Sequence, residues 1–286
     1  GPNPCPRQAI CSRPPFNNMS VQLHYFQLRA RAEPLRMMLR YSGLEYADVI
    51  MPLEEWFLDP SNSAGVPRPG GAKEKMPPGR TGERQLPVLG LPDGTLMPEA
   101  LDIARYIAER GNPSLLGTDQ TKADRLATLG DRTRQERADA GSKLPYLENY
   151  NIVNPILNWF SVEESEVQIP TFLTAVPEAM RYLVGELGSG PFFGGEAPDY
   201  GDFVVFHYVD NLVTLDGGAT LQGLGDAGVG FRAWFDRMRS LPAVAAYLAE
   251  RPQPGVAAVG RPGSIMATVA QPSELPVVKR ALASIG

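Results

Sequence analysis

The stretch from Leu86 to Arg110 restricts the possible folds more than any other part of the chain. Two short apolar runs flank the Asp93-Gly94 pair, and a helical pattern follows directly. An Asp-Gly pair between apolar runs is typical of a tight hairpin, because glycine adopts a positive φ without steric cost. We expect Glu99 in the first helical turn, where N–H groups lack partners and attract anions. The stretch therefore predicts a strand, a hairpin, a second strand and a helix, with an anion-binding corner beside Pro87.

Two strands and a helix are predicted ahead of this stretch. Residues 21–26 alternate between apolar and polar side chains, as a half-buried strand does, and residues 46–51 suit a second, parallel strand. Between them, residues 32–43 have helical spacing, with Pro34 in the first turn and a terminal glycine. Residues 59–84 are rich in Pro and Gly and predict irregular structure with at most a short turn of helix. Residues 19–111 thus predict an α/β layered domain.

Only helical patterns follow the linker at residues 112–118. They begin with a charged, Ala- and Leu-containing segment over 119–149 and continue through residue 250. Asp199 and Asp202 have the spacing of a capping box ahead of one apolar helix. The sequence predicts an all-α bundle over residues 119–252. Residues 1–18 are expected to be a disordered leader or tag, and the Pro-rich extension over 253–286 to be extended on the surface or disordered.

Composition excludes several classes of function. The net charge of −5 gives no basic footprint for a nucleic acid, and no apolar run approaches the roughly 20 residues of a membrane helix. Both cysteines, Cys5 and Cys11, precede Met19, and only His24 and His207 could supply imidazole. The sequence therefore has too few cysteines and histidines to favour a disulfide scaffold, a cysteine nucleophile or a metal site. These observations favour a cytoplasmic protein that binds neither nucleic acid, membrane nor metal.

The order of several motifs adds a resemblance to a known family. Between Val21 and Pro252 the chain resembles the cytosolic glutathione transferases, and among them the sigma-like, tyrosine-type branch. The resemblance rests on Tyr25-Phe26, Arg29-Ala30-Arg31-Ala32-Glu33, Trp56, Gln85-Leu86-Pro87-Val88-Leu89, Glu99-Ala100, Pro191-Phe192-Phe193-Gly194-Gly195 and Asp199-Tyr200-Gly201-Asp202-Phe203. It implies the glutathione transferase fold, in which a thioredoxin-like N-terminal domain precedes an all-α C-terminal bundle, and it implies a homodimer with glutathione as co-substrate.

The resemblance also implies a set of site residues. Tyr25 would supply the hydroxyl, and Arg31 the guanidinium, that favour the thiolate of glutathione. Leu86, ahead of a cis-proline at Pro87, would pair its backbone with the cysteinyl residue, and Glu99 would meet the γ-glutamyl amine. The γ-glutamyl carboxylate would lie on the helix that starts at Glu99. The remaining glutathione-binding positions of the motifs are Trp56, Gln85 and Ala100.

The chain departs from the family pattern at two positions. Ala100 stands where a serine is usual, and Pro60 stands where a lysine usually meets the glycyl carboxylate. The segment 62–84 is longer than the family pattern, and its cations Lys73, Lys75, Arg80 and Arg84 are candidates to replace that lysine. Asp131 is compatible either with a contact to the γ-glutamyl amine across a dimer interface or with a solvated helix face.

The leading interpretation is a glutathione S-transferase that adds the thiol to a small hydrophobic electrophile. The alternatives are a glutathione-dependent isomerase and a non-catalytic relative that binds ligands or partners, which Ala100 and Pro60 favour. The resemblance implies a second-substrate pocket built from residues 27–30, residues 132–141 and the C-terminal extension. Away from the site, we expect His207 to be a satisfied core residue and His24 to lie on the surface or a sheet face.

Overall fold

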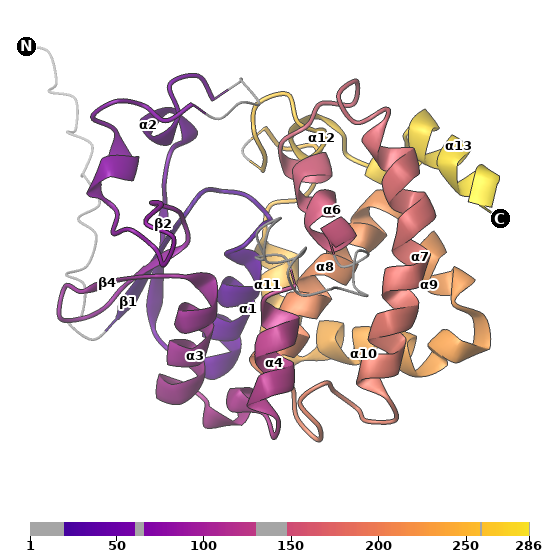
Figure 1. Cartoon of the computed structure of the whole chain (residues 1–286), viewed down its shortest axis with the longest axis horizontal. Helices are drawn as coiled ribbons and strands as arrows, with labels where there is room; N and C mark the ends of the chain where they lie inside the picture. The colour runs from indigo at the N-terminus through magenta and orange to yellow at the C-terminus, as the bar shows by residue number, and fades with distance from the viewer. Residues whose placement is uncertain (1–19, 61–65, 130–147, 258, 286) are drawn as a thin grey trace, which may run out of the picture.

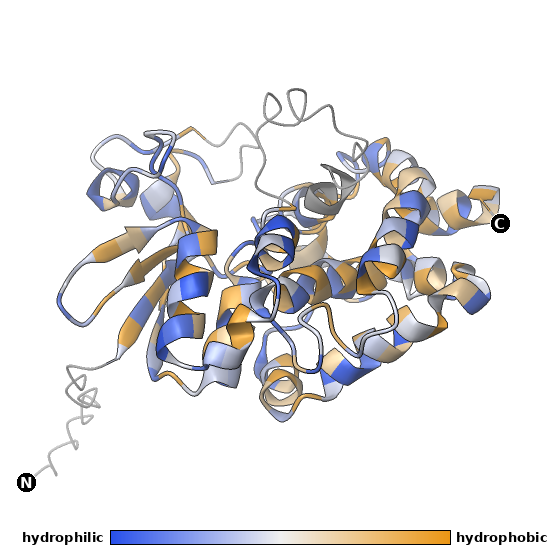
Figure 2. Ribbon diagram, turned by 60° about the horizontal axis from the view of Figure 1, so that its bottom comes forward, coloured by the Kyte–Doolittle hydropathy of each residue, from blue (hydrophilic) through white to orange (hydrophobic). Residues whose placement is uncertain are grey.

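The computed structural model describes residues 20–60, 66–129, 148–257 and 259–285. A sheet-containing half and a helical half lie side by side, and the helix α8 (Tyr200–Asp216) runs through the middle of the helical half (Figure 1). The hydrophobic residues of the strands and helices lie mainly on their inward faces (Figure 2). The apolar core continues across both halves.

The sheet has four strands in the order β2, β1, β3, β4. Strand β1 (Val21–Tyr25) is parallel to β2 (Tyr46–Ile50) and antiparallel to β3 (Val88–Gly90), which in turn is antiparallel to β4 (Leu96–Pro98). The predicted hairpin is confirmed: the Leu91 N–H donates to Thr95 O over 2.8 Å, and Gly94 takes a φ of 87°. The end of β1 therefore lies beside the start of β3, and this brings distant motifs together.

Two helices cover the sheet, and two short helical turns flank it. Helix α1 (Glu33–Ser42) buries its apolar stripe and ends at Gly43, whose φ of 75° suits glycine. Helix α3 (Ala100–Arg110) packs beside α1. The short helix α2 (Leu53–Trp56) and the 3₁₀ turn η1 (Ala72–Lys75) lie in the segment between β2 and β3. The turn η1 matches the single turn of helix expected there.

The position of Glu99 differs from the prediction. Glu99 precedes α3 rather than lying in its first turn, and its backbone takes a φ of 72°. The chain leaves β4 at Pro98 and enters α3 at Ala100, so one residue makes the whole change of direction. A positive φ is unfavourable for a residue with a side chain, so surrounding contacts must hold it.

The second half contains only helices in its described part, as predicted. After η2 (Pro113–Leu116), the helices are α4 (Gln120–Ala127), α6 (Glu148–Asn158), α7 (Gln168–Leu187), α8, α9 (Ala219–Gly223), η3 (Gly225–Gly228), α10 (Val229–Ser240) and α11 (Pro242–Glu250). The helix predicted over 119–149 corresponds to α4 and the start of α6, while residues 130–147 lie outside the described residues. Asp199 and Asp202 form the predicted capping box at α8, with both side chains accepting from backbone N–H groups.

The prediction for the C-terminal extension is wrong. Its residues form α12 (Ile265–Thr268), η4 (Pro272–Glu274) and α13 (Pro276–Ile285). Helix α13 packs against α7 and buries Val277 and Val278 (Figure 1). The prolines suggested a break, but Pro272 and Pro276 occupy helix starts, where the missing N–H is not needed.

Candidate active site

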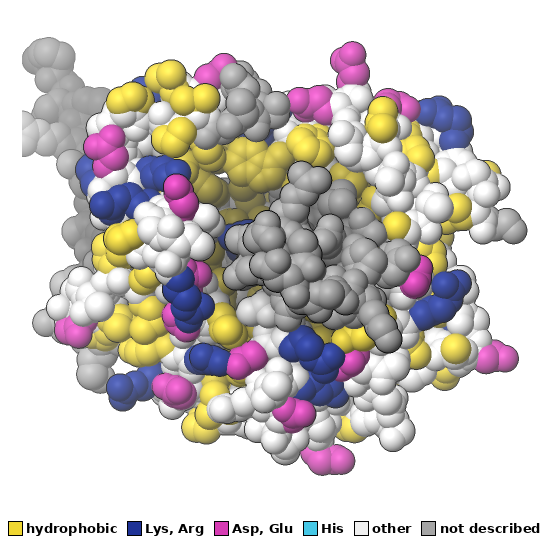
Figure 3. Space-filling view, viewed as in Figure 1, with side chains coloured by type: hydrophobic (Ala, Val, Ile, Leu, Met, Phe, Trp, Pro, Cys, Tyr) yellow, Lys and Arg dark blue, Asp and Glu magenta, His cyan; other side chains and the backbone are white. Residues whose placement is uncertain are grey.

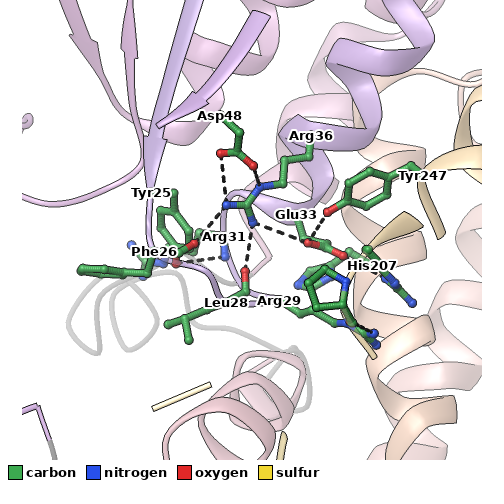
Figure 4. Close-up of polar contacts among 12 residues, drawn as sticks. Tyr25, Phe26, Leu28, Arg29, Arg31, Glu33, Arg36, Asp48, His207 and Tyr247 are labelled. Carbon is green, nitrogen blue, oxygen red and sulfur yellow. Dashed lines mark hydrogen bonds and ion pairs between the residues drawn. The ribbon is translucent and has the colours of Figure 1, made fainter. Parts of the chain in front are cut away.

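Tyr25 ends β1 and turns its side chain toward the loop that leads into α1. The side chain is buried, with 5% of the residue exposed, and its hydroxyl accepts a hydrogen bond from the Arg31 N–H over 3.3 Å (Figure 4). The Arg36 guanidinium carbon lies 5.8 Å from the centre of the tyrosine ring. The loop after β1 therefore fixes where the hydroxyl oxygen lies.

Arg31 connects three of the predicted site positions. Its backbone contacts Tyr25, and its Nη1 donates to Gln85 Oε1 over 3.2 Å. Arg31 also lines a cavity of about 20 Å³ with Ala100 at the start of α3. Tyr25, Arg31, Gln85 and Ala100 thus lie around one corner of the sheet-containing half, as the motifs require.

The peptide bond between Leu86 and Pro87 is cis, as expected from the resemblance. Leu86 is buried, yet neither its N–H nor its C=O has a hydrogen-bond partner in the described ranges. A backbone donor and acceptor without partners can pair with an extended peptide, as an edge strand does.

The first turn of α3 offers N–H groups to the same corner. The N–H groups of Ala100, Leu101 and Asp102 precede the first helical donor, because the Ile103 N–H is the one that donates to Glu99 O. These donors suit a carboxylate. The Glu99 carboxylate is turned toward the segment before β3, and its Oε1 accepts the Arg80 N–H over 2.7 Å.

Trp56 ends α2 and is 5% exposed. Its ring meets the Phe26 ring edge-on, with the ring centres 5.5 Å apart, and Phe26 in turn lies 5.4 Å from the Tyr25 ring. The indole N–H has no acceptor among the residues described, and an indole N–H is a donor only. Trp56 therefore packs as an aromatic core residue.

Arg36 holds the Tyr25 loop, and no sequence motif predicted this role. Arg36 is 4% exposed and donates to Phe26 O over 3.0 Å, to Leu28 O over 3.1 Å and to Asp48 Oδ2 over 2.6 Å (Figure 4). The only signal was its place among the buried positions of α1, three residues after Glu33. Burial disfavours the charge of Arg36, but Tyr247, Asp48 and Glu33 outweigh it and raise the pKa.

Glu33 links the two halves of the molecule. Its carboxylate accepts from Tyr247 Oη over 2.7 Å and from Arg251 Nη1 over 2.9 Å, and Arg251 also pairs with Asp210 over 2.5 Å. Burial alone would raise the pKa of Glu33, but Arg251 and Arg36 outweigh it and lower the pKa. The charge that begins α1 is therefore matched by Arg251 at the end of α11, which Asp210 of α8 also holds in place.

The helical half also holds the Tyr25 loop by its backbone. Asn158 Nδ2 donates to Arg29 O over 3.1 Å, and Asn211 Nδ2 lies 3.4 Å from the same oxygen. The Arg29 side chain is 4% exposed and donates to Gln253 Oε1 over 3.2 Å, and burial together with Arg251 lowers its pKa to about 10. Residues of α6 and α8 therefore help to set the path of residues 25–31.

The two histidines lie on different elements, His24 on β1 next to Tyr25 and His207 on α8. His207 is 1% exposed, and its Nε2 lies 3.4 Å from Asn211 Nδ2, but its Nδ1 has no partner in the described part of the chain. The expectation of a satisfied core residue is thus only half right. Burial lowers the pKa of His207 to about 4. His24 lies half-buried on β1, and burial lowers its pKa as well.

The cations of the segment before β3 divide into two groups. Lys73 and Arg84 line an open pocket of about 350 Å³ together with Arg68 and Glu74. Lys and Arg side chains gather over this part of the surface (Figure 3). Arg80 instead pairs with Asp102 at 2.5 Å, and Lys75 is exposed and does not line the pocket. Lys73 and Arg84 therefore remain the candidates for the missing lysine, with Arg68 added by the structure.

Some predicted elements of the site lie outside the described residues, namely Asp131 and residues 132–141. Within the described ranges, no three His, Cys, Asp or Glu side chains gather as a metal site would need. No helix in those ranges is long and apolar enough to cross a membrane.

Comparisons with known proteins show which proteins this chain is similar to. Residues 162–250 match the glutathione S-transferase C-terminal domain. The hematopoietic prostaglandin D synthase of Gallus gallus is 26% identical over 83% of this chain and 99% of its own length. The class-mu 28 kDa glutathione S-transferase of Schistosoma japonicum is 26% identical over 68% of this chain and 82% of its own length.

A solved structure has the same fold. Rat hPGDS complexed with a quinoline matches with a TM-score of 0.57 and 22% identity, over 83% of this chain and all of that one (100%). The four-stranded sheet and the helical half agree with the fold of this structure. Over residues 162–250, and at the level of the whole fold, the chain is therefore similar to the glutathione transferases.

Proposed function

We propose that this chain is a glutathione S-transferase in which Tyr25 activates the thiol of glutathione for attack on a small hydrophobic electrophile. The proposal depends above all on the contact between the Tyr25 hydroxyl and the Arg31 N–H at 3.3 Å. A phenol oxygen that accepts one hydrogen bond still carries a proton to donate. We assign that donor to the glutathione sulfur.

Thiol activation explains why a tyrosine and an arginine are needed together. A free thiol has a pKa near 8.5, so only a small part is thiolate at neutral pH. A hydrogen bond from Tyr25 and the positive charge of Arg31 both favour the thiolate and lower the thiol pKa. The sulfur then attacks an electrophilic carbon, the new C–S bond forms, and the leaving group departs with its bonding electrons.

The remaining site residues bind the tripeptide. The backbone of Leu86 pairs with the cysteinyl residue, the N–H groups from Ala100 onward receive the γ-glutamyl carboxylate, and Glu99 receives the γ-glutamyl amine. Trp56 donates its indole N–H, and Gln85 and Pro87 shape the same wall. The pocket of Arg68, Lys73 and Arg84 supplies the charge for the glycyl carboxylate in place of a lysine at Pro60.

Substitution of Tyr25 by Phe tests this function. The Tyr25→Phe variant should lose most of its conjugation of a chlorodinitrobenzene-type substrate, and the glutathione thiolate absorbance should disappear at neutral pH. The matched control is Tyr106→Phe, because Tyr106 is half-buried on α3 and outside the site. Equal activity of the two variants would remove Tyr25 from its proposed role.

A glutathione-dependent isomerase is the second candidate, and the similarity to the Gallus gallus prostaglandin D synthase favours it. Such a reaction would use the same thiolate, so Tyr25→Phe would abolish it too. A non-catalytic ligand-binding relative is the third. Retention on immobilised glutathione with elution by free glutathione separates it from both enzymes, because failure to bind would leave only this candidate.

We also propose a class, a location, an oligomeric state and domain boundaries for this chain. We place the chain in the sigma-like, tyrosine-type branch, as a cytoplasmic homodimer that acts in detoxification. Residues 19–111 form the glutathione-binding domain and residues 119–252 the helical domain, joined by residues 112–118 and followed by the extension at 253–286. Size-exclusion chromatography with light scattering tests the dimer.

A further inference from the structure

We propose that the turn at residues 79–83 is a positioning element that presents Glu99 to the amino group of the co-substrate. This inference rests on the proposed use of glutathione. It assigns a role to the segment that makes the chain longer than the family pattern between α2 and β3, and it makes Gly79 a residue that determines specificity.

The turn is closed by its own backbone hydrogen bonds. The Gly79 N–H donates to Glu83 O over 2.8 Å, and the Gly82 N–H donates to Gly79 O over 2.9 Å. Gly82 takes a φ of 81°, a conformation that glycine adopts without strain. These contacts give the turn one defined shape without any contact to a ligand.

This shape fits a single oxygen of Glu99. Oε1 accepts the Arg80 N–H over 2.7 Å, and it lies so close to Gly79 that a Cβ there would be 2.4 Å from it. The turn is also tied to α3, because the Arg80 guanidinium pairs with Asp102 at 2.5 Å. Only a residue without a side chain at position 79 allows the backbone to approach the carboxylate this closely.

The second oxygen of Glu99 remains available to a ligand. In the described part of the chain, Oε2 has no hydrogen-bond donor, and the residue is held at a φ of 72°. A strained backbone and a carboxylate fixed through one oxygen are the features of a pre-organised binding group. Glu99 therefore keeps its binding geometry before the ligand arrives.

Glu99 and the start of α3 together suit the amino acid end of a ligand. The carboxylate pairs with an ammonium group, while the unpaired N–H groups after it pair with a carboxylate. A thiol whose ammonium and carboxylate groups lie on one carbon contacts both Glu99 and the N–H groups of α3. A thiol without the ammonium group contacts only the N–H groups. The turn thus fixes the Glu99 carboxylate, so that ligands with a free amino group bind more tightly than ligands without one.

The experiment compares Gly79→Ala with Thr81→Ala. Thr81 lies in the same turn and is exposed, so its variant should behave as the wild type. In Gly79→Ala, the new methyl group displaces Oε1, and the KM for glutathione should rise roughly tenfold with kcat little changed, as expected for one lost hydrogen bond to a charged group. A KM within twofold of the wild type would overturn the inference.

A glutathione analogue that lacks the α-amino group supplies a second readout. The wild type should prefer glutathione over this analogue, and Gly79→Ala and Glu99→Gln should both lose most of that preference. Glu99→Gln keeps the acceptor for the Arg80 N–H, so it tests the charge even if Gly79→Ala fails to fold. If Glu99→Gln retains the full preference, Glu99 does not read the amino group. A wild type that ignores glutathione altogether would instead refute the proposed function.

Discussion

Lowering the pH from 7.5 to 5 is expected to destabilise the protein through His207. This side chain is 1% exposed, and burial lowers its pKa from the usual 6.5 to about 4 in the folded protein. Glu33 and Asp210 oppose the shift, while Arg251 and Arg29 support it. The folded protein therefore keeps His207 neutral at a pH where the unfolded chain has already bound a proton.

The magnitude follows from the two pKa values. Between pH 6.5 and 4 the unfolded state binds more protons than the folded state, so the free energy of unfolding falls as the pH falls. For pKa values of 6.5 and about 4, the loss between pH 7.5 and pH 5 is about 2 kcal/mol. Asp199 has the opposite effect, because burial and Asp202 raise its pKa to about 7.

A difference measurement separates His207 from Asp199. We would follow urea unfolding by tryptophan fluorescence at pH 7.5 and pH 5 for the wild type and for His207→Gln. Between the two pH values, the free energy of unfolding of the wild type should fall by about 2 kcal/mol more than that of the variant. The contributions of the other titratable groups cancel in this difference when they act independently of His207. His24→Gln is the control, with a smaller change because His24 is only half-buried. An equal pH dependence for the wild type and His207→Gln would refute the reasoning.

Two further substitutions test the helical half. Asp202→Ala removes the acceptor of the Trp234 indole N–H at 2.7 Å and of three backbone N–H groups. The free energy of unfolding should therefore fall by about 3 kcal/mol or more. The control is Asp226→Ala, which should change it little because Asp226 is exposed. Asn158→Ala removes a buried donor to Arg29 O, and kcat should fall with KM for glutathione little changed, as measured by steady-state kinetics with the thiolate titrated in parallel. An unchanged thiol pKa in Asn158→Ala would show that the loop keeps its path without this contact.

The order of the elements was predictable because each one carries a local signal. The hairpin has its Asp-Gly pair, α1 its terminal glycine, and α8 its two capping acids, and all three appear where they were expected. Glu99 was misplaced by one residue because the sharp change of direction from β4 to α3 depends on contacts with Arg80 and Gly79. Those residues are 19 and 20 positions away in sequence, and no local pattern connects them.

The prediction for the C-terminal extension was wrong for a related reason. Prolines are common both in disordered tails and at helix starts, so they do not distinguish the two. Whether a helix forms depends on whether an apolar surface is available to pack against it. Val277 and Val278 find that surface on α7, which is about a hundred residues earlier in the chain. Local sequence thus predicts an element, but burial against a distant partner decides whether it forms.

The buried charges explain why the site needs both halves. Glu33 is 1% exposed, and two of its partners, Tyr247 and Arg251, belong to the helical half or its end. Without them, a carboxylate would be left beside Arg36 with fewer donors, and a buried charge that loses a partner costs several kcal/mol. Arg36 in turn holds Phe26 O and Leu28 O, which set the loop that directs the Arg31 N–H to Tyr25. Disturbing the interface between the halves is therefore expected to move the hydroxyl of Tyr25, although no residue of the helical half needs to touch the thiol.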